Sequence, residues 1–155
     1  MSIDNKALTT FLLVARAKTY AGSGGMVTAA LAGSKQLEYV EGDWLYRDVY
    51  YVGKGLFTGL ETIYAAGKPV WSMSYFGDFT QMTEEEIDRI LRVALIEKKD
   101  TARLWLHVDH KIEDYVYSCE GIGSIEKMSG VEIVKKAGKQ VYHFQYAGGI
   151  IGPDL

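Results

Sequence analysis

Residues 59–77 read GLETIYAAGKPVWSMSYFG, and residues 130–148, at an offset of 71 positions, read GVEIVKKAGKQVYHFQYAG. The alignment extends without a gap back to Asp43 and Asp114, and ten of its thirty-five positions are identical. Unrelated segments of ordinary composition share roughly one position in fifteen. We therefore expect an internal duplication, with tandem repeats at about residues 3–77 and 83–148.

Each repeat begins with a pattern typical of an amphipathic helix. In the first, apolar residues recur at helical spacing over 3–15, and Ser2 or Asp4 can cap the start. In the second, residues 83–86 fit a capping box, and the apolar stripe follows over 87–95. Because both patterns are apolar on one side only, we expect each helix to cover a sheet.

Aromatic and β-branched residues follow each helix and predict an antiparallel meander. The expected strands are Leu37–Val40, Asp43–Val52, Leu60–Ala65 and Val70–Phe76, then Leu104–Val108, Tyr115–Cys119, Val131–Lys136 and Val141–Ala147. The turns at 66–68 and 137–139 both read Ala-Gly-Lys, where Gly can take the positive φ of a tight hairpin. We predict an α+β protein in which the two helix-plus-meander repeats form one pseudo-twofold domain over residues 1–155, with one continuous sheet or two packed sheets.

The composition limits the classes of function. The chain has 155 residues and a net charge of −3, which argues against a broadly basic nucleic-acid surface. The single cysteine, Cys119, cannot form an intramolecular disulfide, which favours a reducing compartment. No apolar run is long enough for a signal peptide or a membrane span. We therefore expect a cytoplasmic protein that engages neither nucleic acid nor membrane.

Two glutamates, Glu61 and Glu132, occupy matching positions in the two repeats. A pseudo-twofold axis could bring them together, and paired carboxylates serve general acid–base catalysis or hard-metal binding. The simpler interpretation is that both are exposed strand residues or partners of Lys68 and Lys139.

Other chemically active residues have equally simple interpretations. A metal site at His107, Asp109 and His110 matches no common ligand spacing, so a solvated strand end is favoured. Cys119 is expected to be a half-buried, inert thiol. The glycine-rich residues 21–25 follow a helix rather than a strand, so they indicate a helix end and a loop, not a phosphate site. We predict no catalytic residue, no bound metal and no cofactor.

Aromatic residues make up 12% of the chain, which is high for its length, and most of them are expected to build the core. Tyr and Trp have an apolar body and a polar tip, so a surplus of them can line a ligand pocket. The irregular stretch at residues 19–36, where the two repeats differ most, is a further candidate for binding. The predicted ligand-binding residues are Tyr20, Trp44, Tyr46, Glu61, Trp71, Tyr75 and Glu132.

Four stretches of the chain carry distinctive motifs: TYAGSGG at 19–25, LEYVEGDWLYRDVYYVG at 37–53, GKPVWSMSYFG at 67–77 and GKQVYHFQYAGGI at 138–150. Together these stretches resemble a family of small bacterial and archaeal proteins known as a domain of unknown function. The resemblance covers about residues 11–151, although residues 96–105 depart from the family's pattern. Members of the family resemble the sensor half of some helix-turn-helix regulators, to which the domain is sometimes fused. The resemblance implies a stand-alone α+β module with no established catalytic residues.

Two classes of function remain open. The first is a non-enzymatic module that binds a small molecule or a protein partner at the seam between the repeats or at the loop of residues 19–36. The second is a small hydrolase or transferase that uses Glu61 and Glu132, or Cys119 with a histidine. Exposed strand edges and surplus aromatic residues also predict that the chain can form a homodimer.

Overall fold

The computed structural model describes residues 3–152. In this range the chain forms two helices and one antiparallel sheet of nine strands in the order β1-β2-β3-β4-β5-β9-β8-β7-β6. The helices are α1 (Asn5–Lys18) and α2 (Glu84–Glu97), and the strands are β1 (Met26–Val27), β2 (Lys35–Glu41), β3 (Trp44–Val52), β4 (Leu56–Ala65), β5 (Lys68–Asp78), β6 (His107–Ile112), β7 (Tyr115–Ser124), β8 (Lys127–Lys136) and β9 (Lys139–Ile150). The predicted α+β class is therefore confirmed, and of the two sheet arrangements left open the chain adopts the continuous one.

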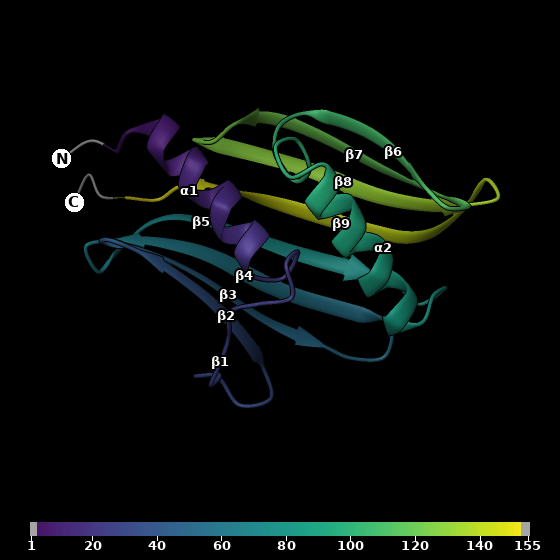
Figure 1. Ribbon diagram of the computed structural model, residues 1–155, viewed down its shortest axis with the longest axis horizontal. Helices are drawn as coiled ribbons and strands as arrows, with labels where there is room; N and C mark the ends of the chain where they lie inside the picture. The colour runs from purple at the N-terminus through teal and green to yellow at the C-terminus, as the bar shows by residue number, and fades with distance from the viewer. Residues whose placement is uncertain (1–2, 153–155) are drawn as a thin grey trace.

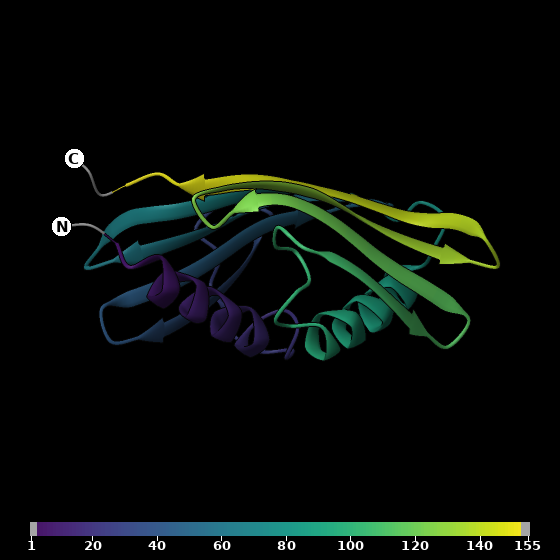
Figure 2. The same cartoon turned by 90° about the horizontal axis from the view of Figure 1, so that it is seen from above.

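Both helices lie against the same face of the sheet, which arches over them (Figures 1 and 2). The strands alternate inward and outward side chains, so each second residue of the central strands points toward the helices. Burying the apolar stripes of both helices against this face builds one core. Its fully buried members include Leu8, Leu12, Ile63, Trp71, Ile90, Leu91, Val134 and Phe144.

The helix starts follow the predicted capping pattern. Asp4 accepts hydrogen bonds from the backbone N–H of Lys6 and Ala7 at the start of α1. The alternative cap, Ser2, lies outside the described residues. At α2, Thr83 and Glu86 form a complete capping box, in which each side chain accepts from the other residue's backbone N–H.

A helix followed by an antiparallel meander occurs twice, and the two meanders correspond closely. The bounds of β4 and β8 differ by 127 − 56 = 71 positions at the start and 136 − 65 = 71 at the end. Both β4 and β8 have a register shift at the same place, after Ile63 and after Val134. The helices are offset by 84 − 5 = 79 positions, because the connection after α1 is longer than that after α2.

The predicted hairpin turns are present at both places. Gly67 and Gly138 have φ of 79° and 75°, and the preceding Ala66 and Ala137 have φ of 49° and 51°. Two successive residues with positive φ form the type of two-residue turn whose twist matches that of the flanking strands.

The strand predicted at Leu104–Val108 is misplaced, because the strand in this region, β6, begins only at His107 and continues to Ile112. Residues 98–106 instead form turns that cross the inner face of the second meander. Leu104 is buried there, and its carbonyl accepts a hydrogen bond from the Tyr146 hydroxyl at 2.5 Å. The apolar pattern therefore arose from packing on the sheet rather than from pairing within it.

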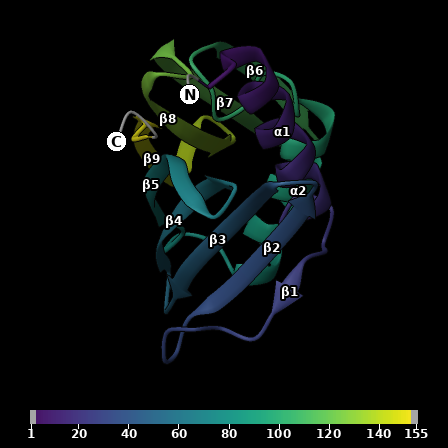
Figure 3. The ribbon, with the colours of Figure 1, turned by 90° about the vertical axis from the view of Figure 1, so that its left-hand side faces the viewer.

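The irregular stretch at residues 19–36 contains the short β1, which forms one edge of the sheet (Figure 3). The helix α1 ends at Lys18 with Thr19 as its C-cap, so the glycine-rich residues 21–25 form the loop just beyond the helix end, where the Gly24 N–H donates to the Thr19 carbonyl at 2.9 Å. The other edge of the sheet is β6.

Candidate functional site

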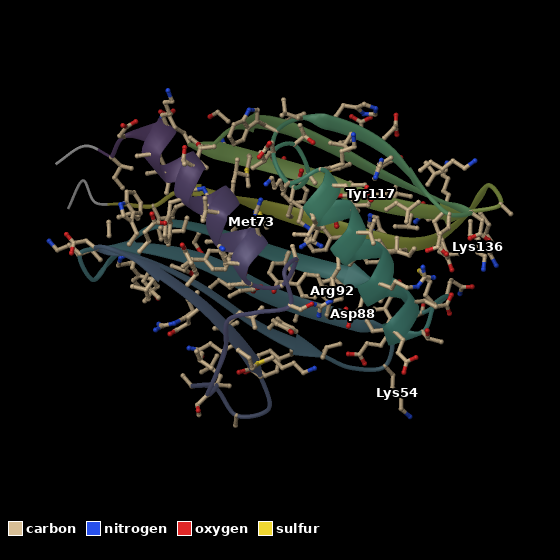
Figure 4. The ribbon with its side chains drawn as sticks, in the orientation of Figure 1. Lys54, Met73, Asp88, Arg92, Tyr117 and Lys136 are labelled. Carbon is tan, nitrogen blue, oxygen red and sulfur yellow. The ribbon has the colours of Figure 1, made fainter. Side chains whose placement is uncertain are left out.

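A cavity of about 160 Å³ lies between α2 and the inner face of the first meander. A smaller hollow of about 30 Å³ shares part of its lining and extends toward α1. On α2, Asp88 and Arg92 project beside the first meander, at the mouth of the larger cavity (Figure 4). Five aromatic side chains line its wall: Tyr20, Tyr50, Phe57, Tyr75 and Phe79.

The polar group at the base of the cavity is Asp48. On β3, every second residue from Trp44 to Val52 points toward the helices, and this alternation places Asp48 on the inner face between Tyr46 and Tyr50. The Asp48 side chain is 7% exposed and lines both hollows. Its Oδ1 accepts a hydrogen bond from the Tyr75 hydroxyl at 2.5 Å. In the part of the chain that the structure describes, no basic side chain forms an ion pair with it.

The position of Asp48 changes its protonation. It lies directly opposite Glu61 across β3 and β4, on the same face of the sheet. Burial, and then the neighbouring Glu61 carboxylate, raise the pKa of Asp48 to about 7. Asp48 therefore exchanges a proton near neutral pH, where an exposed aspartate would be fully ionised.

Glu61 is buried and fully partnered. The Arg16 guanidinium, at the end of α1, donates to both carboxylate oxygens at 2.8 and 2.9 Å, and the Tyr46 hydroxyl donates to Oε2. Burial alone would raise the pKa of Glu61, but Arg16 and Tyr46 outweigh it and lower this pKa. Glu61 is therefore the ionised member of the opposed pair of carboxyls.

Glu132 has the same kind of environment in the second meander. Arg103 donates to its two oxygens at 2.9 and 3.0 Å, and the hydroxyls of Tyr117 and Tyr142 donate to it as well. Glu132 is 0% exposed and Glu61 is 4% exposed. The prediction that the two glutamates are exposed or pair with Lys68 and Lys139 is therefore wrong, because buried arginines neutralise both.

Arg103 connects the two halves of the molecule. Its carbonyl accepts a hydrogen bond from Arg16 Nη1 at 3.0 Å, while its own guanidinium reaches Glu132 and lies 4.3 Å from the Phe144 ring centroid. Arg103 also lines the cavity and has a φ of 58°. A non-glycine residue with positive φ is strained, and such strain persists where surrounding contacts hold it.

Two matching tyrosines lie across two matching glycines, Tyr75 across Gly59 and Tyr146 across Gly130. An added Cβ would come within 2.4 Å of the Tyr75 hydroxyl at Gly59 and within 2.2 Å of the Tyr146 hydroxyl at Gly130. Glycine is therefore required for each tyrosine to lie flat on the sheet.

The partners of these two tyrosines differ. Tyr75 donates to Asp48 beside the cavity, whereas Tyr146 contacts Cys119 at 3.3 Å and donates to the Leu104 carbonyl. In the second half, the turns after α2 fill the space that is open in the first. Cys119 is fully buried, and this burial raises the pKa of its thiol, which is therefore neutral.

The structure places the other predicted binding residues in different surroundings. Tyr20 is in the cavity wall, where its hydroxyl donates to Asp88 at 2.6 Å and its ring stacks under Arg92. Trp44 packs on Phe11 and lines an open groove beside α1, away from the cavity under α2. Trp71 is fully buried in the core, and its indole N–H donates to a backbone carbonyl.

The histidine cluster is on the surface. The two ring nitrogens of His107 contact Asp109 at 2.7 Å and Glu120 at 2.5 Å, and all three side chains are more than half exposed. Residues 3–152 contain no group of three or more side chains placed to hold a metal ion. No helix in the same range is both long enough and apolar enough to cross a membrane.

Sequence reasoning did not identify several residues of the site. Arg16, Arg103, Asp88 and Arg92 come from helices or turns, and their spacing on the chain does not reveal which carboxylates they meet. Asp48 did have a signal, since it is the one acidic residue within the inward alternation of aromatic residues on β3.

One comparison identifies a family. The sequence profile of a family described as Domain of unknown function (DUF5680) matches residues 48–151. This match begins at Asp48 and includes Glu61, Arg103 and Glu132. No curated protein and no solved structure matches the chain.

Proposed function

This chain belongs to the DUF5680 family, whose description states no activity, and from its geometry we propose that it is a non-enzymatic module that binds a small organic molecule. The observation that carries this proposal is the aromatic cavity with one buried, unneutralised carboxyl at its base. Ligand pockets are commonly apolar or aromatic, with a few polar groups that fix the orientation of the ligand.

The size of the cavity supports a small ligand. A volume of about 160 Å³ is close to that of cavities that hold benzene-sized molecules, which measure roughly 150 Å³. Tyr75 and Tyr50 offer ring faces, while Asp48 offers a directed hydrogen bond. A ligand with a flat or aliphatic body and one polar end fits these features.

The candidate catalytic side chains already have hydrogen-bond partners or are buried, and this favours binding over catalysis. Glu61 and Glu132 each accept hydrogen bonds from an arginine and from tyrosine, so neither is free to take a proton from a substrate. Cys119 is a buried, neutral thiol rather than the exposed thiolate of a nucleophile. The residues on which a hydrolase or transferase would depend, Glu61, Glu132 and Cys119, therefore serve the folded structure instead.

The matching halves support an origin by internal duplication, as the sequence predicts. The offset of 71 positions between the meanders, the paired register shifts and the two tyrosine–glycine crossings agree with such an origin. On this proposal, the second half lost its cavity to the turns that carry Leu104, and the first half kept it for a ligand.

Ligand-observed NMR with a fragment library tests the proposal. Fragments of about six to twelve non-hydrogen atoms suit the cavity, and saturation-transfer signals report which of them bind. A Val52→Phe variant adds a ring to the cavity wall and should remove these signals. As the matched control, Val116→Phe makes the same change at an exposed position on β7 and should retain them.

Two results would overturn the binding function. One is a library without any binder to the wild-type chain. The other is a set of binders whose signals survive Val52→Phe as well as they survive Val116→Phe, which would place them outside the cavity.

A further inference from the structure

Building on the proposed binding function, we infer that the ligand of the cavity carries an organic ammonium group, which pairs with the Asp48 carboxylate while its apolar body lies among the aromatic rings. The connected polar cluster holds three carboxyl groups, on Asp48, Glu61 and Glu132, but only two guanidiniums, on Arg16 and Arg103.

The unpaired charge can be assigned to Asp48. Arg16 makes two hydrogen bonds to Glu61, and Arg103 makes two to Glu132, so each guanidinium is already matched with one carboxylate. Asp48 has only the neutral Tyr75 hydroxyl as its partner among residues 3–152. A buried carboxylate without a cation is costly, so the cluster must take up either a proton or a cation at this position.

The surroundings favour an organic cation over a bare ion. Tyr50, Phe57 and Tyr75 form the wall beside Asp48, and aromatic faces attract ammonium groups and also shelter an apolar body. An inorganic cation would need several oxygen ligands, whereas residues 3–152 hold no cluster of three metal-ligating side chains.

Charged and titratable groups lie around Asp48 on the elements that line the two hollows. Arg16 and Glu61 face it from α1 and β4, Arg103 from the turns after α2, and Tyr46 and Tyr75 from β3 and β5. The rim carries Lys35, Glu84, Asp88, Arg92 and Lys99, and the wall carries Tyr20 and Tyr50. The rim charges have mixed signs, and the exposed ones are screened by water and salt. The charge at the base therefore dominates the choice of ligand.

Three probes of the cavity test the inference: benzylamine, the isosteric benzyl alcohol, and toluene, which has the same ring and no polar end. Calorimetric titration at about pH 8 should show benzylamine binding about ten to one hundred times more tightly than benzyl alcohol, because its hydrogen bond to the carboxylate is charge-assisted. Asp48→Asn should abolish this preference while retaining weak binding of all three probes. Asp43→Asn, a change of the same kind at an exposed position, should leave the preference intact.

Proton release gives a second readout. The amine replaces the proton on Asp48, whose pKa is raised to about 7 by burial and by Glu61. Titrations at about pH 6 in buffers of different ionisation enthalpy should therefore show release of close to one proton per benzylamine bound. The release should decline toward zero at about pH 8.5, and it should be absent in Asp48→Asn.

The outcomes separate this inference from the function on which it rests. If benzyl alcohol and toluene bind in the cavity as tightly as benzylamine, or if the amine binds without releasing a proton, the ligand is not an ammonium compound and only the inference fails. If none of the three probes binds, and the fragment library also finds nothing, both the inference and the binding function fail. The binding of ammonium chloride should be compared with that of benzylamine in the same titration. If the ammonium ion alone bound as tightly as benzylamine, the ligand would not need an organic body.

Discussion

The buried Asp48 carboxyl should make the stability of the protein depend on pH. Its pKa is about 7 in the folded chain, owing to burial and Glu61, against an ordinary value near 3.8 in the unfolded chain. Between these two values the folded state retains a proton that the unfolded state releases. The free energy of unfolding contributed by this group therefore falls as the pH rises from about 4 to about 7.

An Asp48→Asn variant removes this titration and keeps an oxygen that accepts from Tyr75. The difference in the free energy of unfolding between the variant and wild type should shift in favour of the variant by roughly 2–4 kcal/mol from about pH 4 to about pH 8. Urea unfolding at both pH values measures the difference. Asp43→Asn should show no comparable trend, and a constant difference between Asp48→Asn and wild type across this range would contradict the prediction.

Glu132 should be among the most costly carboxylates to neutralise. It is 0% exposed and accepts from Arg103 and two tyrosines, so Glu132→Gln would leave the Arg103 guanidinium buried without a counter-charge. We expect a loss of about 3–5 kcal/mol in the free energy of unfolding.

A surface pair provides the comparison for Glu132→Gln. Asp114 lies 3.9 Å from Lys136 in an exposed ion pair, and Asp114→Asn should cost less than about 1 kcal/mol. Guanidinium chloride unfolding of both variants measures the contrast. Equal effects would mean that the buried pairs do not stabilise the fold more than surface ones.

At the scale of elements, the crossing of β4 by the Tyr75 ring depends on the absence of a side chain at Gly59. A Cβ there would meet the Tyr75 hydroxyl at 2.4 Å and Tyr50 Cβ at 2.7 Å. Gly59→Ala should therefore displace Tyr75 from Asp48 and cost about 1–3 kcal/mol in a packed interior.

Gly53 provides a control in the loop between β3 and β4, because nothing lies within 4 Å of a Cβ added there. Gly53→Ala should change the free energy of unfolding by less than about 0.5 kcal/mol. Thermal unfolding of both variants tests the contrast, and a Gly59→Ala variant as stable as Gly53→Ala would show that Tyr75 can move without cost.

The elements themselves were largely predictable because their signals are local. The capping box at Thr83 and the Ala-Gly-Lys turns fix element ends through contacts a few residues apart. Leu104 misled the prediction, because burial by packing on a sheet and burial within a sheet give the same apolar pattern. Only tertiary structure separates the two.

The candidate site was less predictable because its charges meet across long separations. Arg16 reaches Glu61 over 45 positions and Arg103 reaches Glu132 over 29. Strand alternation is a local signal, and it puts Tyr46 and Tyr75 on the inner face of the sheet. It could not show which carboxylate would lack an arginine, and that difference distinguishes Asp48 from the two glutamates.

At the scale of the whole molecule, the two halves should unfold together. The β5 and β9 strands pair from Trp71 and Ile150 to Asp78 and His143, which makes the two meanders one sheet. Arg16 donates to the Arg103 carbonyl, and the Trp71 indole donates to the Ile125 carbonyl, so each half completes the hydrogen bonding of the other. Opening the seam would expose core aromatic residues and unpair a central row of backbone groups.

Fluorine NMR of the chain labelled with 5-fluorotryptophan tests this cooperativity with only one added fluorine on each indole ring. Trp71 reports on the first half and Trp105 on the second, and each resonance can be assigned from one Trp→Phe variant. The native signals of both residues should disappear at the same urea concentration, as expected for a small domain with a single cooperative transition. A Trp105 signal lost at lower urea than that of Trp71 would show instead that the second meander unfolds independently, and that the seam between β5 and β9 does not unite the halves.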